Sequence, residues 1–418
     1  SCPNSEDAFY GQDGNYVINQ QSYTKLDDQG NELPNSTTSW AMVRDNVTGL
    51  IWEVKQAKDS TQDLSNVHDA DNQYAWYDSN PETNGGFSGN FNNGNNTGEY
   101  TKILNAQAFG GFSDWRLPSQ QELRTIVHAV NYNPTIQTDY FQNTQAKYYW
   151  SSTANDYNSD TAWGVYFYNG HDGNSDKVSS AYVRAVRGGK CGTENHLVIN
   201  NDGTVTDINS GLMWQEEKTP DMSWELALSY CQDLSLAGYS DWRLPGKGTL
   251  ESITDLALSE PAINTHVFLD NSSGFFWTST TFAHLPDIAW NIDFDLGYNF
   301  NDLKDKPNNV RAVRGGQIQL MDHLFIQAPM QASYWKTGDD MLIQWEPQSF
   351  IDNVTISLSR QGGKNGTYEI LATTDNDGEF NWTVKGESSV NCMLKIEPVS
   401  NPDKGTRQGL FVISQGKS

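Results

Sequence analysis

The chain has 418 residues, with 52 acidic and 27 Lys or Arg side chains, and a formal net charge of −25 at pH 7. Such a surface repels phosphate backbones and anionic membranes, which argues against both as partners and favours a neutral ligand, a cation or a basic protein. Aromatic residues make up 12% of the chain and charged residues 19%, a balance typical of secreted β-rich and sugar-binding proteins.

The cysteines and the lack of a long apolar run favour a secreted protein. No stretch is apolar for long enough to span a bilayer, and the chain begins at Ser1 without a leader, so we expect that a signal peptide has been removed. Cys2 and Cys191 each precede a repeat described below, which predicts a disulfide between them. Cys231 and Cys392 are equally well explained as buried thiols, and four cysteines allow three full pairings.

One motif occurs twice. Asp-Trp-Arg-Leu-Pro stands at residues 114–118 and again at 241–245. Four flanking blocks match in the same order: 48–52 with 210–214, 149–153 with 276–280, 162–163 with 289–290, and 183–189 with 310–316. The matched blocks predict two homologous globular units, each long enough to close its own core.

The first repeat is predicted to contain short strands, including residues 50–54, and then a long insertion over residues 55–98. The tip of this insertion is rich in Asn and Gly, so it either displays contact groups or is held by an ion, with a solvated loop as the alternative. Ser119 and Glu122 form a capping-box pattern that predicts a helix after the pentapeptide. Strands are predicted over 148–152, 162–167 and 181–187, with polar loops at 154–161 and 169–179.

The second repeat is predicted to follow the same order with a shorter connection. Helices are expected over residues 224–234 and from Gly246 through Leu256, and loops at 281–288 and 297–308. Beyond Gly316, β-rich runs separated by turns recur about every ten residues, which is typical of an all-β sandwich. The predicted domains are residues 1–190, 191–316 and 317–418.

A family resemblance follows from three motifs of the first repeat, which the second repeat shares: Gly-Gly-Phe-Ser-Asp-Trp-Arg-Leu-Pro at 110–118, Tyr-Trp-Ser-Ser at 149–152, and Val-Arg-Ala-Val-Arg-Gly-Gly at 183–189. Together they resemble the Lcl C-terminal domain family over roughly residues 40–316. The resemblance implies the C-type lectin-like and formylglycine-generating-enzyme-like fold group, in proteins that are usually secreted or surface-exposed and in several cases adhesive. Residues 328–413 resemble the Kre9/Knh1-type β-sandwich of secreted and wall-associated proteins.

The signature residues themselves are interpreted as structural. Trp115 and Trp242 are expected in the core. The repeated arginines are expected to pair with Asp114, Asp241 and backbone carbonyls through their forked donors. These arginines are Arg116, Arg184, Arg187, Arg243, Arg311 and Arg314.

The loops in which the two repeats differ are the predicted ligand site. Their aromatic rings can stack on the CH faces of sugars, and their amides and carboxylates can pair with hydroxyls. Protein-binding loops use the same residue types, so a glycan and a protein are both candidate ligands. The candidate ligand-binding residues are Asn155, Tyr157, Asn158, Trp163, Tyr166, Tyr168, His171, His284, Trp290, Asp293, Asp295, Tyr298 and Asn299.

Calcium is the candidate cofactor. Asp172, Asn174 and Asp176 have the alternating oxygen side chains with which calcium loops begin. The glycine and the glutamate that complete an EF-hand are missing, and a solvated turn is the alternative. No common catalytic motif is found in the sequence, so no enzyme activity is predicted.

The predicted fold class is α+β, with two tandem C-type lectin-like domains and a C-terminal all-β immunoglobulin-like sandwich. The predicted function is a secreted, cell-surface-associated adhesin that binds a glycan or a protein through its variable loops, without nucleic acid or membrane insertion. The alternative is a structural subunit of a surface filament or layer, in which the same aromatics mediate self-assembly. An enzyme related to formylglycine-generating enzymes is the third hypothesis.

Overall fold

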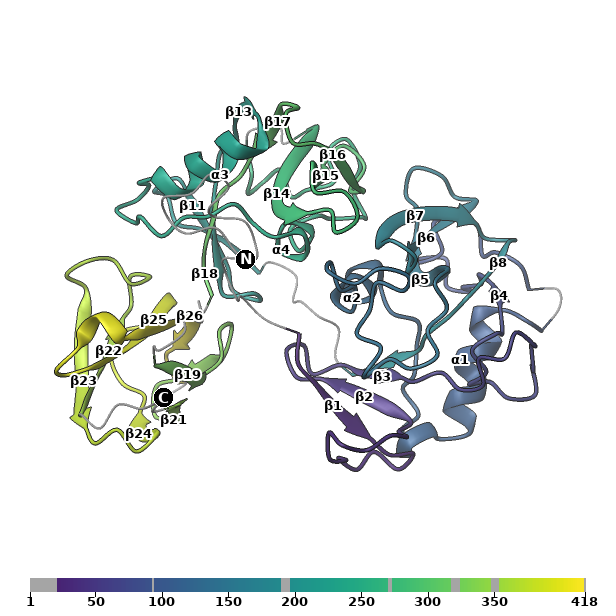
Figure 1. Ribbon diagram of the computed structural model, residues 1–418, viewed down its shortest axis with the longest axis horizontal. Coiled ribbons are helices and arrows are strands. Elements are labelled where there is room, and N and C mark those ends of the chain that lie inside the picture. Colours follow the sequence, from purple (N-terminus) through teal and green to yellow (C-terminus); the bar gives the residue numbers. More distant parts are fainter. Residues whose placement is uncertain are drawn as a thin grey trace.

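The computed structural model describes residues 21–91, 94–188, 196–269, 273–316, 324–346 and 353–416. The predicted Cys2–Cys191 pair lies outside these ranges. The described chain is mostly β-structure with short helices, in three successive parts that each have hydrophobic cores (Figure 1). Within the same ranges, no helix is long and apolar enough to cross a membrane.

The first repeat contains two main sheets and a two-stranded pair. The first sheet has the order β1 (Tyr23–Leu26), β2 (Met42–Asp45), β3 (Ile51–Glu53), β9 (Val186–Arg187). The second has the order β5 (Tyr148–Ala154), β6 (Thr161–Tyr166), β7 (His171–Asp176), and β4 (Tyr74–Ala75) pairs with β8 (Ser180–Ala181). The helical segments are α1 (Thr97–Ala106), η2 (Phe109–Gly111) and α2 (Gln120–Thr125).

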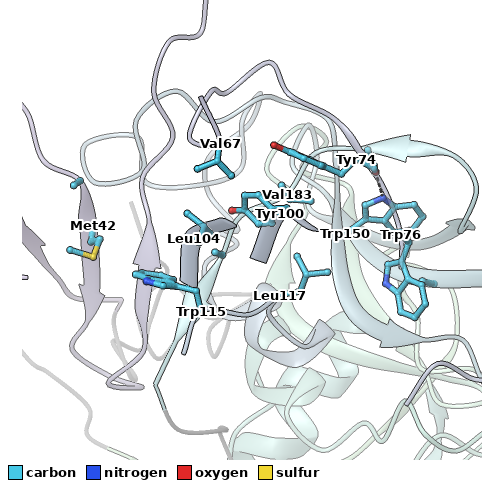
Figure 2. Close-up of a cluster of buried hydrophobic side chains, with 14 of the residues drawn as sticks. Met42, Val67, Tyr74, Trp76, Tyr100, Leu104, Trp115, Leu117, Trp150 and Val183 are labelled. Atoms are coloured by element: carbon cyan, nitrogen blue, oxygen red, sulfur yellow. Dashed lines mark hydrogen bonds between the residues drawn. The ribbon is translucent and has the colours of Figure 1, made fainter. Parts of the chain in front are cut away.

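Two buried clusters hold the first repeat together. Figure 2 shows one of them, in which Trp76, Trp115 and Trp150 lie around Tyr100 and Leu104 of α1. The predicted capping box at the start of α2 is confirmed. It fixes α2 against β5 and β6, on the side of the sheet that faces the second repeat.

The second repeat has the corresponding sheets. One has the order β10 (Leu197–Ile199), β11 (Thr204–Asp207), β12 (Leu212–Gln215), β18 (Val313–Gly315). The other has the order β13 (Thr219–Met222), β17 (Asn308–Val310), β14 (Phe275–Thr281), β15 (Ile288–Asp293), β16 (Asn299–Leu303). Its helices are α3 (Trp224–Asp233) and α4 (Lys247–Glu251).

The third part consists of two sheets that share one core, which includes Trp345, Trp382 and Phe411. The smaller sheet has the order β19 (Phe325–Ala328), β21 (Asp340–Glu346), β24 (Glu379–Thr383). The larger has the order β20 (Tyr334–Lys336), β26 (Thr406–Ser414), β25 (Ser389–Pro398), β22 (Val354–Ser359), β23 (Tyr368–Thr374), with η3 (Pro402–Lys404) between β25 and β26. The β-rich runs predicted here correspond to β21 through β26.

Two predictions about the second half of the repeats were wrong. The polar segments predicted as loops at 169–179 and 297–308 contain strands β7 and β16, because backbone hydrogen bonds to β6 and β15 need no apolar side chains. The single strand predicted over 181–187 is divided into β8 and β9. Between them, buried Arg184 donates from Nη1 to the backbone oxygen of Glu53 at 2.5 Å.

The structural interpretation of the signature residues is confirmed, with one partner that was not predicted. Arg187 pairs with Asp114, and Arg314 pairs with Asp241, both at 2.7 Å. Trp115 and Trp242 are buried. Arg116 donates from Nη1 to the backbone oxygen of Leu117 at 3.2 Å. Both of its terminal nitrogens also donate to the carboxylate of Glu122, at 2.7 Å for each bond, which ties the pentapeptide to α2.

The Asn- and Gly-rich insertion is held by a lysine. The buried Lys177 Nζ donates to the backbone oxygens of Asn84, Phe87 and Ser159 at 2.7, 2.9 and 2.6 Å. The same ammonium lies 4.5 Å from the centre of the Trp76 ring. The cation that organises this loop is therefore supplied by the chain itself.

Candidate functional site between the two repeats

The two repeats face each other across corresponding elements. Residues 114–187 and 241–314 correspond at a constant offset of 127 positions. Strand β7 contacts its counterpart β16, and helix α2 contacts its counterpart α4 (Figure 1). Contact between like elements is the pattern of a twofold-symmetric interface, here formed within one chain. We call this interface the seam.

Ring contacts across the seam are reciprocal. Trp163 lies against Tyr298, with ring centroids 4.4 Å apart and an interplanar angle of 45°. Its counterpart Trp290 lies against His171, with centroids 4.6 Å apart and an angle of 49°. Because Trp163 corresponds to Trp290 and His171 corresponds to Tyr298, the two contacts are equivalent under the pseudo-twofold symmetry.

The polar contacts across the seam repeat this symmetry. Asn174 Nδ2 donates to the hydroxyl of Tyr298. The counterpart amide of Asn301 lies 3.0 Å from Nε2 of His171. Close to the pseudo-twofold axis, the backbone nitrogen of Asp172 donates to Oδ1 of Asn299 at 3.0 Å, and these two residues also correspond. The predicted loop residues thus bind each other across the seam.

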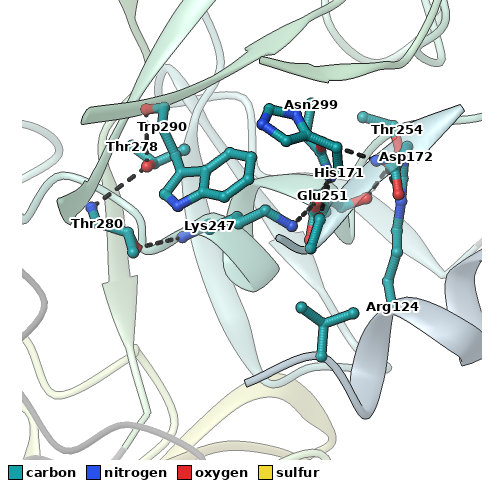
Figure 3. Close-up of polar contacts among 12 residues, drawn as sticks. Arg124, His171, Asp172, Lys247, Glu251, Thr254, Thr278, Thr280, Trp290 and Asn299 are labelled. Atoms are coloured by element: carbon teal, nitrogen blue, oxygen red, sulfur yellow. Dashed lines mark hydrogen bonds and ion pairs between the residues drawn. The ribbon is translucent and has the colours of Figure 1, made fainter. Parts of the chain in front are cut away.

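Buried charges complete the seam, as Figure 3 shows. Arg124 pairs with Asp172 at 2.6 Å and donates across the seam to the backbone oxygen of Gly297 at 2.7 Å. On the other side, Lys247 pairs with Glu251 at 2.5 Å. All four charged side chains are at most 4% exposed.

One pair of corresponding positions in the seam carries opposite charges. Arg124 corresponds to Glu251. Burial lowers the pKa of the Arg124 guanidinium, but the nearby carboxylates of Asp172 and Glu251 outweigh burial and raise it. Two identical repeats would place like charges here, which would be costly in a buried site. The difference between the copies therefore makes the seam electrostatically complementary.

His171 is neutral in this setting. Burial, and then the nearby ammonium of Lys247, lower the pKa of its imidazole to about 4. A neutral ring can accept a hydrogen bond from Asn301 and lie against Trp290 without the cost of a buried charge.

The residues of the calcium prediction, Asp172, Asn174 and Asp176, have different surroundings in the structure. The Asp172 carboxylate already accepts hydrogen bonds from Arg124 and, at 2.9 Å, from Gln120. Asn174 is engaged with Tyr298, and Asp176 is exposed at the end of β7. Within the ranges that the structure describes, no group of three or more His, Cys, Asp or Glu side chains is placed to hold a metal ion.

A cleft of about 290 Å³ opens at one edge of the seam. The first repeat lines it with Asn155, Asp156, Tyr157, Asn158, Trp163 and Asn174; the second lines it with Leu256, Leu258, Ser259, Leu296 and Tyr298. Asp156 is the charged member of this lining. We call this site the inter-repeat cleft.

The predicted ligand residues divide into groups. Five of them line the inter-repeat cleft: Asn155, Tyr157, Asn158, Trp163 and Tyr298. His171, Trp290 and Asn299 lie within the seam. Tyr166, Tyr168 and His284 lie at the opposite edge of the seam. Asp293 and Asp295 form a turn in which the Asp295 nitrogen donates to Asp293 Oδ1 at 2.9 Å, and they do not line the cleft.

Sequence reasoning missed the helix residues of the seam and one wall of the cleft. The seam residues are Gln121 and Arg124 of α2, Lys247 and Glu251 of α4, and Thr254 just after α4. The missed wall residues are Leu256, Leu258, Ser259 and Leu296. The opposite charges of Arg124 and Glu251, at corresponding positions of the two helices, were a signal that these helices meet.

A second cleft, also of about 290 Å³, lies in the first repeat beside the insertion. Its lining includes Trp76, Tyr77, Asp78 and Arg116. It contains none of the predicted ligand residues.

Comparisons with known proteins identify the repeats. The model of the Lcl C-terminal domain matches residues 41–187 and 203–314. No curated protein matches the chain. Among solved structures, the two tandem V-type regions of VCBP3, a v-region-containing chitin-binding protein, align at 12% identity over 30% of this chain and 58% of that one. The TM-score of 0.15 is too low for this alignment to carry an argument.

Proposed function

This chain belongs to the Lcl C-terminal domain family, and on that premise we propose that it is a secreted, surface-associated adhesin whose ligand binds in the inter-repeat cleft. Recognition is noncovalent. The ligand is a glycan or a protein displayed on a surface, and the third part of the chain spaces or anchors the two repeats. In this proposal the repeats have the C-type lectin-like fold, and the third part is an immunoglobulin-like sandwich of the Kre9/Knh1 type.

The observation that carries the proposal is the lining of the cleft. Tyr157 is 71% exposed at its edge, so its ring is accessible to a ligand. Beside it lie the rings of Trp163 and Tyr298 and the amides of Asn158 and Asn174. Rings next to a few convergent polar groups are typical of small-ligand sites.

We propose that binding needs no metal and that the chain is not an enzyme. The thiol of Cys231 is buried, and burial raises its pKa, which disfavours the reactive thiolate. Glu53 contacts Lys55 at 3.0 Å and His68 at 2.9 Å, but these residues line neither cleft described above. Burial raises the pKa of Glu53, and Lys55 and His68 outweigh that effect and lower it, as in a structural ion cluster.

The test is binding of the full chain to an array of immobilised glycans, with calcium and with a chelator. We expect chelation to leave binding unchanged and Tyr157→Ala to weaken it about tenfold, since stacking on one ring contributes roughly 1 kcal/mol or more. Tyr334→Ala is the matched control, because Tyr334 is also exposed but lies in the third part of the chain. Binding that disappears with the chelator, or that Tyr157→Ala leaves intact, would contradict the proposed site.

Self-assembly is the second candidate function. Phe275 of β14 and Phe300 of β16 are exposed on the second repeat and contact each other across β15, with ring centroids 5.7 Å apart. Such an apolar patch can mediate contacts between copies. Concentration-dependent association that Phe300→Ser abolishes, without any glycan binding, would favour this alternative.

A further inference from the structure

The seam has two edges related by its pseudo-twofold symmetry, and only one of them is the inter-repeat cleft. The residues of the opposite edge are the counterparts of the cleft residues in the other repeat, 127 positions away in the sequence. Tyr157 then corresponds to His284, and Ser259 corresponds to Tyr132. These two pairs of counterparts make the two edges different.

At the opposite edge, the two counterparts cover each other. The His284 ring stacks on Tyr132, with centroids 3.8 Å apart and an interplanar angle of 18°. Tyr168 supports the stack from the side, 4.7 Å from Tyr132. Phe282, which stands where the cleft has Asn155, packs against Trp290 at 5.2 Å. Aromatic rings therefore occupy the place that is open at the cleft.

At the cleft, the corresponding ring is uncovered. Ser259 is too small to reach over Tyr157 as Tyr132 reaches over His284. No aromatic ring within the described part of the chain lies against Tyr157, which is 71% exposed. At the opposite edge, the ring at this position is His284, and the flat six-membered ring of Tyr132 covers it at stacking distance.

The charge of the cleft lining favours an uncharged ligand over an acidic one. Its lining contains one carboxylate, Asp156, and no Lys, Arg or His side chain, and the chain as a whole has a formal charge of −25. Sulfated or acidic saccharides would be repelled there. A pyranose presents a flat CH face to a ring and hydroxyls to neighbouring amides, and it needs no charge partner.

We propose that the inter-repeat cleft takes one uncharged saccharide segment per chain, with a pyranose face stacked on Tyr157 in the place that Tyr132 takes at the opposite edge. This inference rests on the proposed function and names its ligand class. It also predicts the stoichiometry. Although the chain has two homologous repeats, the Tyr132–His284 stack closes the second position, so one ligand binds.

The experiment is titration calorimetry of the full chain with short uncharged oligosaccharides (cello-, xylo-, manno- and chito-oligosaccharides), with a sulfated oligosaccharide for comparison. We expect a stoichiometry of one for an uncharged ligand and no binding of the sulfated one. Ser259→Tyr should place a phenol over Tyr157 and weaken binding at least tenfold. Tyr132→Ser combined with Phe282→Asn and His284→Tyr should open the opposite edge and raise the stoichiometry to two. Tyr334→Ala should change nothing.

The outcomes separate this inference from the proposed function. Saccharide binding that survives both Ser259→Tyr and Tyr157→Ala would preserve a binding function and overturn the cleft as its site. Two ligands on the unmodified chain, or preference for the sulfated probe, would overturn the inferred stoichiometry or ligand class. A protein ligand that Ser259→Tyr displaces, without any saccharide binding, would preserve the proposed function and overturn the saccharide. Thermal unfolding of each variant checks that the fold is retained.

Discussion

At the scale of single residues, the ammonium of Lys177 holds the Asn- and Gly-rich insertion, for which the sequence predicted displayed contact groups, a bound ion or a solvated loop. The Asn- and Gly-rich tip has little apolar surface with which to pack, so its backbone carbonyls must find donors. From one buried ammonium, Lys177 donates to two of these carbonyls, those of Asn84 and Phe87, and to the carbonyl of Ser159 outside the insertion. Gly89 allows the close approach that this arrangement needs, because a Cβ there would lie 2.1 Å from the Trp76 oxygen.

Lys177→Met tests this role. The substitution keeps most of the side-chain volume but leaves three carbonyls without the ammonium, so we expect the free energy of unfolding to fall by about 3 kcal/mol. Denaturant unfolding measures the loss, and limited proteolysis should cut within the insertion. Lys304→Met is the control: the corresponding lysine lies 4.0 Å over Trp224 and holds no insertion, so a smaller effect is expected. Equal losses for both variants would contradict the proposed role.

At the scale of elements, strand β7 has a polar sequence because its side chains contact the second repeat of the same chain. Its backbone pairs along its whole length with β6, while Asp172 and Asn174 contact the second repeat. Alternating apolar residues mark a strand only where one face covers its own core. The pattern therefore predicted a loop where a strand forms.

Arg124→Met tests the anchoring of β7 to the seam. The variant leaves the buried carboxylate of Asp172 without its cation, and loss of one partner from a buried pair costs about 3–5 kcal/mol. Hydrogen exchange of β7 and β16 amides should accelerate, and the unfolding free energy should fall. Arg187→Met provides the contrast, because its partner Asp114 is 54% exposed and the pair should contribute less than about 1 kcal/mol. An unchanged exchange rate at β7 would show that the pair does not hold the seam.

At the scale of the whole molecule, the two repeats have different surroundings. The third part of the chain covers the second repeat at Gly211, where an added Cβ would lie 2.3 Å from the Leu410 oxygen. The corresponding Gly49 has open space around it. Likewise, the Arg314 side chain is 1% exposed, whereas its counterpart Arg187 is 20% exposed. The seam is formed by the corresponding face of each repeat, and in the second repeat this is not the face that the third part covers.

The seam should weaken in acid. The folded state lowers the pKa of His171 to about 4, below its ordinary value, so the unfolded chain binds more protons as the pH falls from about 6.5 toward 4. The neutral ring contributes to the free energy of unfolding above about pH 6.5. This contribution, up to about 3 kcal/mol, is lost as the pH falls from about 6.5 to 4. Urea unfolding at pH 7 and at about pH 4.5 should show the loss, and His171→Phe should reduce it. The same pH dependence in both proteins would contradict this assignment.

Much of each repeat could be predicted from residues that act within that repeat. The capping box of α2, the buried Trp115 and the pair of Arg187 with Asp114 were all predicted, since each is satisfied by residues of its own unit. The strands of the third part were predicted because their alternation covers one core. The cleft was found in part: Tyr157 and Trp163 were named for their chemistry, whereas Leu256 and Ser259 carry no such signal.

The sequence by itself determined that the chain contains a duplicated domain of the Lcl C-terminal family, because repeated motifs record contacts made inside each copy. It also determined which loops vary between the copies. Only the tertiary structure decided that these loops face each other, that Arg124 meets the second repeat, and that one edge of the seam is open while Tyr132 and His284 close the other. The physical reason is that local periodicity encodes how a segment packs on its own core. Contacts between residues more than a hundred positions apart depend on how two finished surfaces fit together.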